Sequence, residues 1–176
     1  NIGGRNALLR NDISTDSWNF VDATKETGLQ MNNQRYSLAS AWEDFDNDGD
    51  QDLYVANDYG RDSLYENQQG HFEDIGDAAG AENAASGMSV TWSDLDHDGW
   101  MDAYVGNMWS SAGNRITFQP EFKADAEQGI KNRLQRFARG NTLLHNNRDQ
   151  TLSDISDDAG VAMGRWAWSS QLADIN

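Results

Sequence analysis

The chain contains no cysteine, a single proline and few basic residues. It has 176 residues, with 13 Lys and Arg against 29 Asp and Glu, which gives a formal net charge of −16. The lack of cysteine excludes disulfides, thiolate metal sites and cysteine nucleophiles. The negative charge disfavours nucleic acids and anionic membrane surfaces as partners. No apolar run reaches the roughly 18 residues of a membrane-spanning helix, so no membrane span is expected.

Aspartate dominates the acidic residues, with 22 Asp and 7 Glu. Aspartate is typical of turns and of sites for hard cations, whereas glutamate is the acid favoured in helices. The chain also holds 7 Trp, 6 Phe and 5 Tyr, too many for a disordered acidic segment. This composition predicts a folded domain whose loops are rich in carboxylates.

A short pattern occurs three times along the chain. Polar residues flank an apolar pair at 6–11, 62–67 and 141–146, followed by Phe-x-Asp or Leu-x-Asp pieces at 20–22, 72–74 and 152–154. A further element occupies 41–57 and 91–107 and begins again at 172–176. The segments are short and bounded by Asp, Asn and Gly, which is typical of strands. Repeats of about 50 residues with four short strands are propeller blades or sandwich hairpins.

The stretch 108–140 interrupts this pattern. Its apolar residues recur at a helical period: Phe122, Ala126, Ile130, Leu134 and Phe137. Pro120 lies near the expected start, and Gly140 suits the C-cap. We therefore expect a helix at about 120–138, with Phe122, Ile130, Leu134 and Phe137 facing the body. Its basic residues form either a solvated face or a docking element for a partner: Lys123, Lys131, Arg133, Arg136 and Arg139.

Two copies of an acidic motif carry the clearest chemistry. Loop positions 1, 3, 5 and 9 are aspartates: Asp44, Asp46, Asp48 and Asp52 in the first copy, and Asp94, Asp96, Asp98 and Asp102 in the second. Glycine at position 6 permits a sharp turn. Carboxylates about 4 Å apart repel by roughly 4 kcal/mol per pair, so a cation is expected among them. Oxygen ligands on a flexible loop favour Ca²⁺ over Mg²⁺, and the carbonyls of Asp50 and Trp100 complete the predicted shells.

The motif is not an EF-hand, because position 12 is Val55 or Val105 where an EF-hand requires glutamate. A third copy starts at 172–176, where Asp174 and Asn176 take positions 1 and 3. With so few ligands it should not hold Ca²⁺ tightly alone. We accordingly expect the segment to be incomplete as a fold unit, with open strand edges covered by further chain or by neighbouring subunits.

These residues resemble the FG-GAP or VCBS-type repeats of the integrin alpha-chain β-propeller, most closely the branch similar to cartilage acidic protein. The likeness rests on the Asp loops, the repeated strands, and an insertion leading through 139–141 to 166–168. It implies an all-β fold, part of a β-propeller of about 50-residue, four-stranded blades with a helical insertion at about 110–140. The division that it implies is 1–29 as the end of a blade, 30–80 as a blade, 81–160 as a blade with helical insertion 108–140, and 161–176 as the start of another.

The same resemblance implies a non-enzymatic calcium-binding segment for extracellular recognition, adhesion or scaffolding. The expected location is extracellular, at the cell surface or in a bacterial periplasm, and the expected partner is a protein or glycan, or another copy joined through open blade edges. The sequence has no hydrolase elbow, zincin helix, phosphate loop or dinucleotide fingerprint. The alternative is a propeller that binds or processes glycans with exposed Trp100, Trp109, Trp166 or Trp168, although we expect most Trp to be buried.

Overall fold

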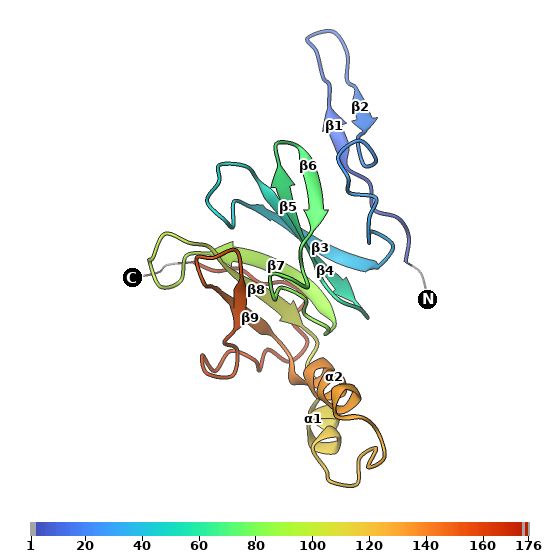
Figure 1. Cartoon of the computed structure of the whole chain (residues 1–176), viewed down its shortest axis with the longest axis vertical. Coiled ribbons are helices and arrows are strands. Elements are labelled where there is room, and N and C mark those ends of the chain that lie inside the picture. The colour runs from blue at the N-terminus through green and yellow to red at the C-terminus, as the bar shows by residue number, and fades with distance from the viewer. Residues whose placement is uncertain (1–2, 174, 176) are drawn as a thin grey trace.

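The computed structural model describes residues 3–173 and 175, and two four-stranded antiparallel sheets form its body (Figure 1). The first sheet contains β3 (Tyr36–Glu43), β4 (Asp52–Asp58), β5 (Ser63–Gln68) and β6 (His71–Asp74). The second contains β7 (Gly87–Ser93), β8 (Asp102–Asn107), β9 (Thr142–Asn146) and β10 (Leu152–Asp154). In both, neighbouring strands follow chain order. The prediction of a mainly β chain built from short strands is confirmed.

The two sheets are structural repeats of each other. In the first, Trp42 of β3 lies opposite Leu53 of β4, and in the second, Trp92 of β7 lies opposite Ala103 of β8. Both pairs of strands shift register at the same place, between Ser37 and Ala39 and between Gly87 and Ser89. Because a bulge bends its strand, β3 and β7 bend at the same position in the two sheets.

The sheets stack face to face, with β7 against β3 and β4. Successive residues of a strand point to opposite faces, so each sheet has two faces that can pack against a neighbour. Tyr54, Ala56 and Leu64 of the first sheet pack against Val105 and Leu144 of the second in one buried cluster. The opposite face of the first sheet forms a second buried cluster from Leu29, Leu53, Val55, Tyr65 and Phe72, which Leu8 joins.

The N-terminal segment, with the hairpin of β1 (Leu9–Asn11) and β2 (Phe20–Asp22), covers part of that second face. Its junction with the first sheet matches the junction between the sheets. The Phe72 amide donates to the Thr27 carbonyl at 2.7 Å, and the Leu152 amide donates to the Ala79 carbonyl, also at 2.7 Å. One stacking arrangement therefore occurs twice along the chain.

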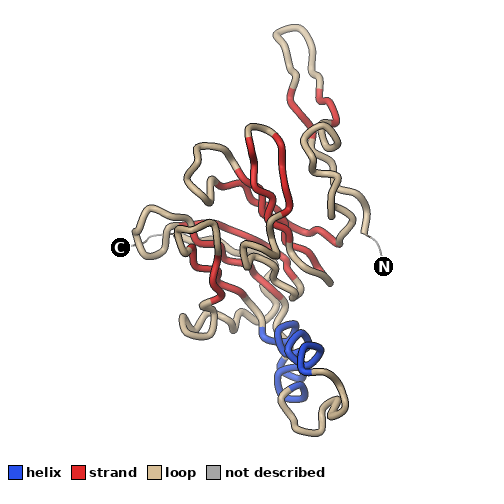
Figure 2. Tube along the Cα trace, viewed as in Figure 1, coloured by secondary structure: helices blue, strands red, loops and turns tan. Residues whose placement is uncertain are grey.

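Two helices, α1 (Ser111–Thr117) and α2 (Gln128–Arg139), project from the body between β8 and β9 (Figure 2). The expected single helix at 120–138 is wrong in its first half, because residues 118–127 form turns and bends. Pro120 lacks the amide that a helix interior needs, and Lys123 has φ of 45°. The predicted end is confirmed, since Gly140 is the C-cap of α2 with φ of 108°. No helix in the described ranges is long and apolar enough to cross a membrane.

The expected inward face of this insertion is only partly correct. Phe137 packs against Tyr59, with ring centroids 5.4 Å apart, and Leu134 is half-buried. Ile130, however, is 44% exposed, because α2 meets the body only near its C-terminal end. Phe122 lies half-buried in the turn between the helices.

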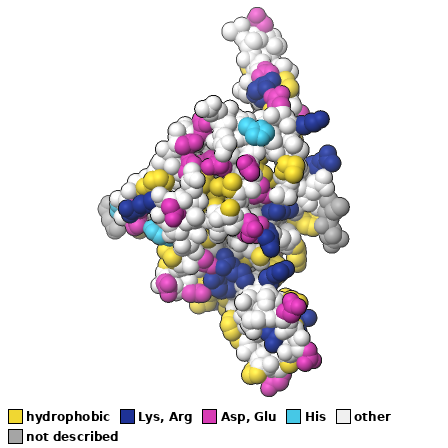
Figure 3. Space-filling model, viewed as in Figure 1, with side chains coloured by type: hydrophobic (Ala, Val, Ile, Leu, Met, Phe, Trp, Pro, Cys, Tyr) yellow, Lys and Arg dark blue, Asp and Glu magenta, His cyan; other side chains and the backbone are white. Residues whose placement is uncertain are grey.

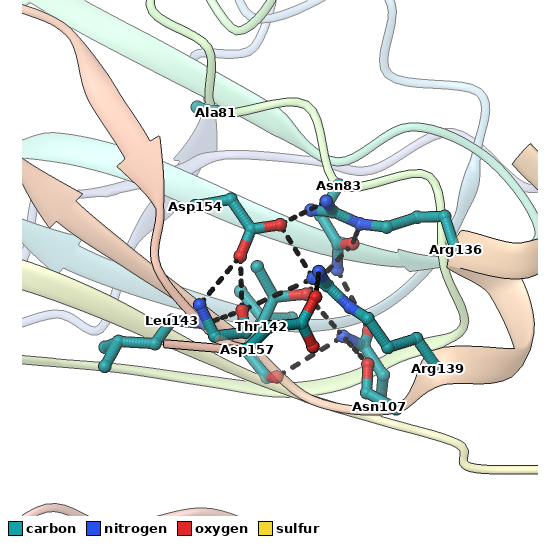
Figure 4. A network of polar contacts seen from close by, with 12 residues as sticks. Ala81, Asn83, Asn107, Arg136, Arg139, Thr142, Leu143, Asp154 and Asp157 are labelled. Atoms are coloured by element: carbon teal, nitrogen blue, oxygen red, sulfur yellow. Dashed lines mark hydrogen bonds and ion pairs between the residues drawn. The ribbon is translucent and has the colours of Figure 1, made fainter. Parts of the chain in front are cut away.

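Two arginines at that end of α2 are not solvated, contrary to expectation. Arg139 pairs with Asp154 at 2.7 Å and with Asp157 at 3.1 Å, and Arg136 also pairs with Asp154 (Figure 4). Arg136 further donates to the buried Asn83 at 3.3 Å. Figure 3 shows basic side chains gathered where the insertion joins the body. The ion pairs fasten the insertion to β10 and the turn after it, and the hydrogen bond to Asn83 fastens it to the segment before β7.

A side-chain clamp closes the base of the insertion. The backbone amide of Asn107, at the end of β8, donates to the side-chain oxygen of Asn141 at 2.9 Å. In the first sheet the Asn57 amide donates to Asp62 Oδ1 at 2.7 Å, across the short loop 58–61. The same clamp thus spans a tight turn in one sheet and the stretch 108–140 in the other.

Candidate metal centres

The two acidic motifs form equivalent loops between paired strands. The first Asp loop (44–52) joins β3 to β4, and the second Asp loop (94–102) joins β7 to β8. Gly49 and Gly99, at position 6, have φ of 96° and 87°. This left-handed conformation is open to glycine at little cost, as the sequence predicted.

The position 1 aspartates organise the backbone of each loop. Asp44 accepts the amides of Asp48 and Gly49, both at 3.0 Å. Asp94 accepts the amides of Asp98 and Gly99, both at 2.9 Å. Because amides hold the position 1 carboxylate from the loop side, the loop is preorganised around it.

Three carboxylates converge in each loop. Oxygen atoms of Asp44, Asp46 and Asp48 all lie within 4.8 Å of one another, and those of Asp94, Asp96 and Asp98 do likewise. Burial, followed by the charge of Asp48, raises the pKa of Asp46. Carboxylate oxygens at this spacing fit the donor set of a hard divalent cation, which would relieve the repulsion among them.

The position 9 aspartates lie outside these triads. Asp52 accepts the Phe45 amide at 3.0 Å and the Asn67 amide at 2.8 Å, which fastens the loop to β5. Asp102 accepts the equivalent amides of Leu95 at 3.2 Å and Asn146 at 2.9 Å. Both carboxylates are buried. Each carboxylate oxygen has two lone pairs, so an oxygen that accepts one hydrogen bond from a backbone amide can still bind an ion.

Burial beneath the first loop also affects the protonation of Asp52. Its pKa rises to about 7, chiefly because burial penalises the charged form. In the second loop, Asp102 lies 3.0 Å from Nδ1 of His145.

The position 7 residues, Asp50 and Trp100, contribute backbone to the loops. Their amides donate to Asp48 and Asp98 respectively, both at 2.8 Å. The side chain of Asp50 instead accepts the Gln69 amide at 2.9 Å, outside the triad. Their carbonyls stay predicted ligands. The third predicted site, at Asp174 and Asn176, lies outside the described residues.

Sequence reasoning missed the residues that surround the loops. The two loops touch, because the Asn47 side chain donates to the Gly99 carbonyl at 3.1 Å. The turn between β9 and β10 reaches both of them: Gln150 donates to Asp46 at 3.3 Å, and Arg148 donates to Asp98 at 2.6 Å. The one available signal was a basic residue in a turn adjoining a motif of aspartates.

The tryptophans are less buried than expected. Trp18, Trp42, Trp166 and Trp168 are exposed, between 44% and 85%, and Trp100 and Trp109 are half-buried. The expectation that most Trp are buried is therefore wrong for this chain. Trp18 lies near the tip of a hairpin that projects from the body, which explains its exposure.

Comparison with protein families gives one match. Residues 44–105 match the model of the FG-GAP-like repeat. The matched stretch contains both Asp loops, β4 to β7 and most of β8, so it supports the resemblance to FG-GAP repeats for this part of the chain. Comparison with curated proteins gives no significant match.

Proposed function

We propose that this chain is a calcium-binding segment of a β-propeller that serves extracellular recognition, adhesion or scaffolding and has no catalytic activity. One observation carries the proposal: the same triad of carboxylates stands at the same place in two consecutive, stacked sheets. An acidic turn that arose for solubility has no reason to keep this spacing twice.

The propeller arrangement is supported by the repeated stacking. Strands in each sheet follow chain order, as in a blade, and the bonds from Phe72 to Thr27 and from Leu152 to Ala79 repeat between layers. A second set of backbone hydrogen bonds occurs three times, from Asn6 to Asn33, from Asp62 to Asn83 and from Asn141 to Ala162. We infer the division 1–29, 30–80, 81–160 and 161–176 from this repetition.

Calcium is the cation that the donor set favours. The triads consist of carboxylate oxygens, with no nitrogen or sulfur ligand among them, and they lie on partly exposed turns whose backbone carbonyls are further oxygen donors. The ion would be held in the first loop by Asp44, Asp46 and Asp48, and in the second by Asp94, Asp96 and Asp98. The position 9 aspartates, Asp52 and Asp102, would be further ligands from the buried side of each loop. Its positive charge would offset the repulsion among carboxylates and fix the turn between the paired strands.

A recognition role agrees with the family match and with the exposed surface. FG-GAP repeats typically occur in extracellular proteins. Trp166 and Trp168 are 63% and 66% exposed, which suits contact with a protein or a sugar ring. Membership of the branch similar to cartilage acidic protein is part of the same proposal.

The test is the dependence of stability on calcium. With dissociation constants near 10⁻⁴ M, about 1 mM Ca²⁺ should add roughly 1.4 kcal/mol per occupied loop. We expect chelator to lower the Tm of the wild-type chain. Asp46→Asn or Asp96→Asn alone should reduce that difference, and the two together should abolish it. Asp158→Asn, an exposed acid outside the loops, is the control and should behave as wild type. A melt that is the same in calcium and in chelator contradicts the proposal.

A further inference from the structure

The two Asp loops differ at one oxygen of the position 5 aspartate. In both loops Oδ1 of that residue accepts the amide of position 7, which leaves Oδ2 for an ion. In the second loop Oδ2 of Asp98 already holds a cation, because Arg148 approaches it with Nε at 2.6 Å and Nη2 at 2.5 Å. A metal ion at this loop therefore meets a guanidinium on one of its ligand atoms.

The first loop has no such counter-charge among the described residues. Oδ2 of Asp48 accepts no hydrogen bond there, and the corresponding turn presents Gln69, whose backbone amide binds Asp50. Gln69 and Arg148 each stand two residues after the asparagine whose backbone amide binds the position 9 aspartate, and both have left-handed backbone, with φ of 56° and 64°. The first loop also has an additional carboxylate, Asp50, where the second has Trp100.

The guanidinium of Arg148 is paired with Asp98, but most of the Arg148 side chain is exposed to solvent. It is 56% exposed, whereas the Asp98 side chain is only 9% exposed. An exposed guanidinium on a four-bond stem can leave its partner without opening the fold, because only solvent lies in its way. Displacement by a divalent ion thus requires a change of rotamer and no backbone movement.

We propose that Arg148 is a built-in competitor for the cation at the second Asp loop, so that this loop binds Ca²⁺ more weakly than the first loop. The inference rests on the proposed calcium binding. It assigns the two loops different working ranges: the first fills at lower calcium, and the second fills only when the ion displaces Arg148 from Asp98. In the absence of calcium, Arg148 neutralises part of the charge of the second loop.

The experiment isolates each loop in the full chain. Asp46→Asn with Asp48→Asn leaves only the second loop, and Asp96→Asn with Asp98→Asn leaves only the first. Titration calorimetry with Ca²⁺ should give a higher Kd for the second loop. With Asp46→Asn and Asp48→Asn in place, Arg148→Gln should lower the Kd of the second loop about two- to fivefold, the range for releasing an exposed ion pair of good geometry. Arg148→Lys, which keeps the charge without the fork, should give an intermediate Kd.

Arg115→Gln is the matched control. Arg115 is exposed on α1, in the projecting insertion, so it changes net charge by the same amount without touching a loop. It should leave both Kd values unchanged. The effect of Arg148→Gln should also shrink at high salt, because exposed charges are screened.

The outcomes separate this inference from the proposed function. If the first loop binds Ca²⁺ but the Kd of the second is unchanged by Arg148→Gln, or is lowered as much by Arg115→Gln, the role of Arg148 is wrong and calcium binding stands. If no loop binds in any variant, both proposals fail.

A second measurement follows Arg148 directly. The Nε–Hε signal of Arg148 in an NMR spectrum should shift on addition of Ca²⁺ as its bond to Asp98 breaks. Arg10, whose Nε donates to Asp12 at 2.9 Å away from the loops, provides the reference signal and should not move. A stationary Arg148 signal at saturating Ca²⁺ would overturn the competition.

Discussion

Replacing Asp62 with asparagine should stabilise the protein at neutral and alkaline pH. Asp62 is completely buried at the start of β5. Its Oδ1 accepts the Asn57 amide at 2.7 Å, and its Oδ2 lies 3.1 Å from the hydroxyl of Tyr54. That hydroxyl also lies 2.8 Å from the Ala81 carbonyl. A phenol has one proton to donate, so both bonds form only when Asp62 itself carries a proton.

The second sheet contains the neutral version of this arrangement. Asn141 occupies the place of Asp62, with its oxygen on the Asn107 amide at 2.9 Å and its nitrogen donating to the Tyr104 hydroxyl at 2.6 Å. Asparagine therefore satisfies the same geometry without a charge. An Asp62→Asn side chain has a ready pattern of hydrogen bonds to adopt.

The magnitude follows from the pKa of Asp62. Burial is the main cause that raises it from 3.8 to about 7. Between these values the folded state binds a proton that the unfolded state has released, so the free energy of unfolding decreases as pH rises. The loss is complete above about pH 7 and amounts to up to about 4 kcal/mol. Asp62→Asn removes that loss, so its advantage over wild type should be absent below about pH 4, partly developed near pH 5 and complete above about pH 7.

Urea denaturation at about pH 5 and about pH 8, in constant excess Ca²⁺, measures the effect. The difference between Asp62→Asn and wild type isolates Asp62, because both proteins share every other titrating group. Asn141→Asp is the converse variant and should acquire a loss of stability with rising pH. If the advantage of Asp62→Asn is the same at both pH values, Asp62 is not held in its neutral form and the reasoning fails.

Two further changes test the packing. Gly80→Ala should lower the free energy of unfolding by about 2 kcal/mol or more, because Gly80 has φ of 69° and a Cβ there would lie 2.7 Å from the Leu152 carbonyl oxygen. Gly160 has the same φ but open space around it, so Gly160→Ala is the control and should cost only about 1 kcal/mol in the same thermal melts. Arg139→Met should cost about 2 kcal/mol at neutral pH, since Asp154 loses an ion pair. The ion pairs hold the pKa of Asp154 below its usual value of 3.8, so that cost should shrink as pH falls from that value toward the lowered pKa, and a cost independent of pH would exclude the ion pair as its cause.

The strands and the Asp loops could be predicted because their signals are local. A strand of alternating residues bounded by Asp and Gly specifies its own conformation, and the spacing of Asp44, Asp46 and Asp48 brings them together within one turn. Repetition strengthened both predictions, since each pattern occurred twice at matching places.

The remaining features depend on contacts between distant parts of the chain. Arg136 and Arg139 looked like a solvated face because their partner, Asp154, lies on a strand beyond the insertion. Arg148 likewise meets Asp98 only because β9 pairs with β8. The helical period at 120–138 was a real signal in its second half, and Pro120 was misjudged as a start when it belongs to the turn before α2.

The clamp between Asn107 and Asn141 fixes where the chain leaves and re-enters the second sheet, whatever the length of the connection between them. The same bond closes the loop 58–61 in the first sheet, so strand register is set by the clamp and not by the length of the connection. Loop-closure entropy rises only slowly with length, by about 0.6 kcal/mol for each doubling. This corner of the sheet is therefore an attachment point: evolution or an engineer can exchange the part of the insertion before Arg136 for another binding element, while Arg136 and Arg139 keep their ion pairs with Asp154 and the strands and Asp loops stay in place.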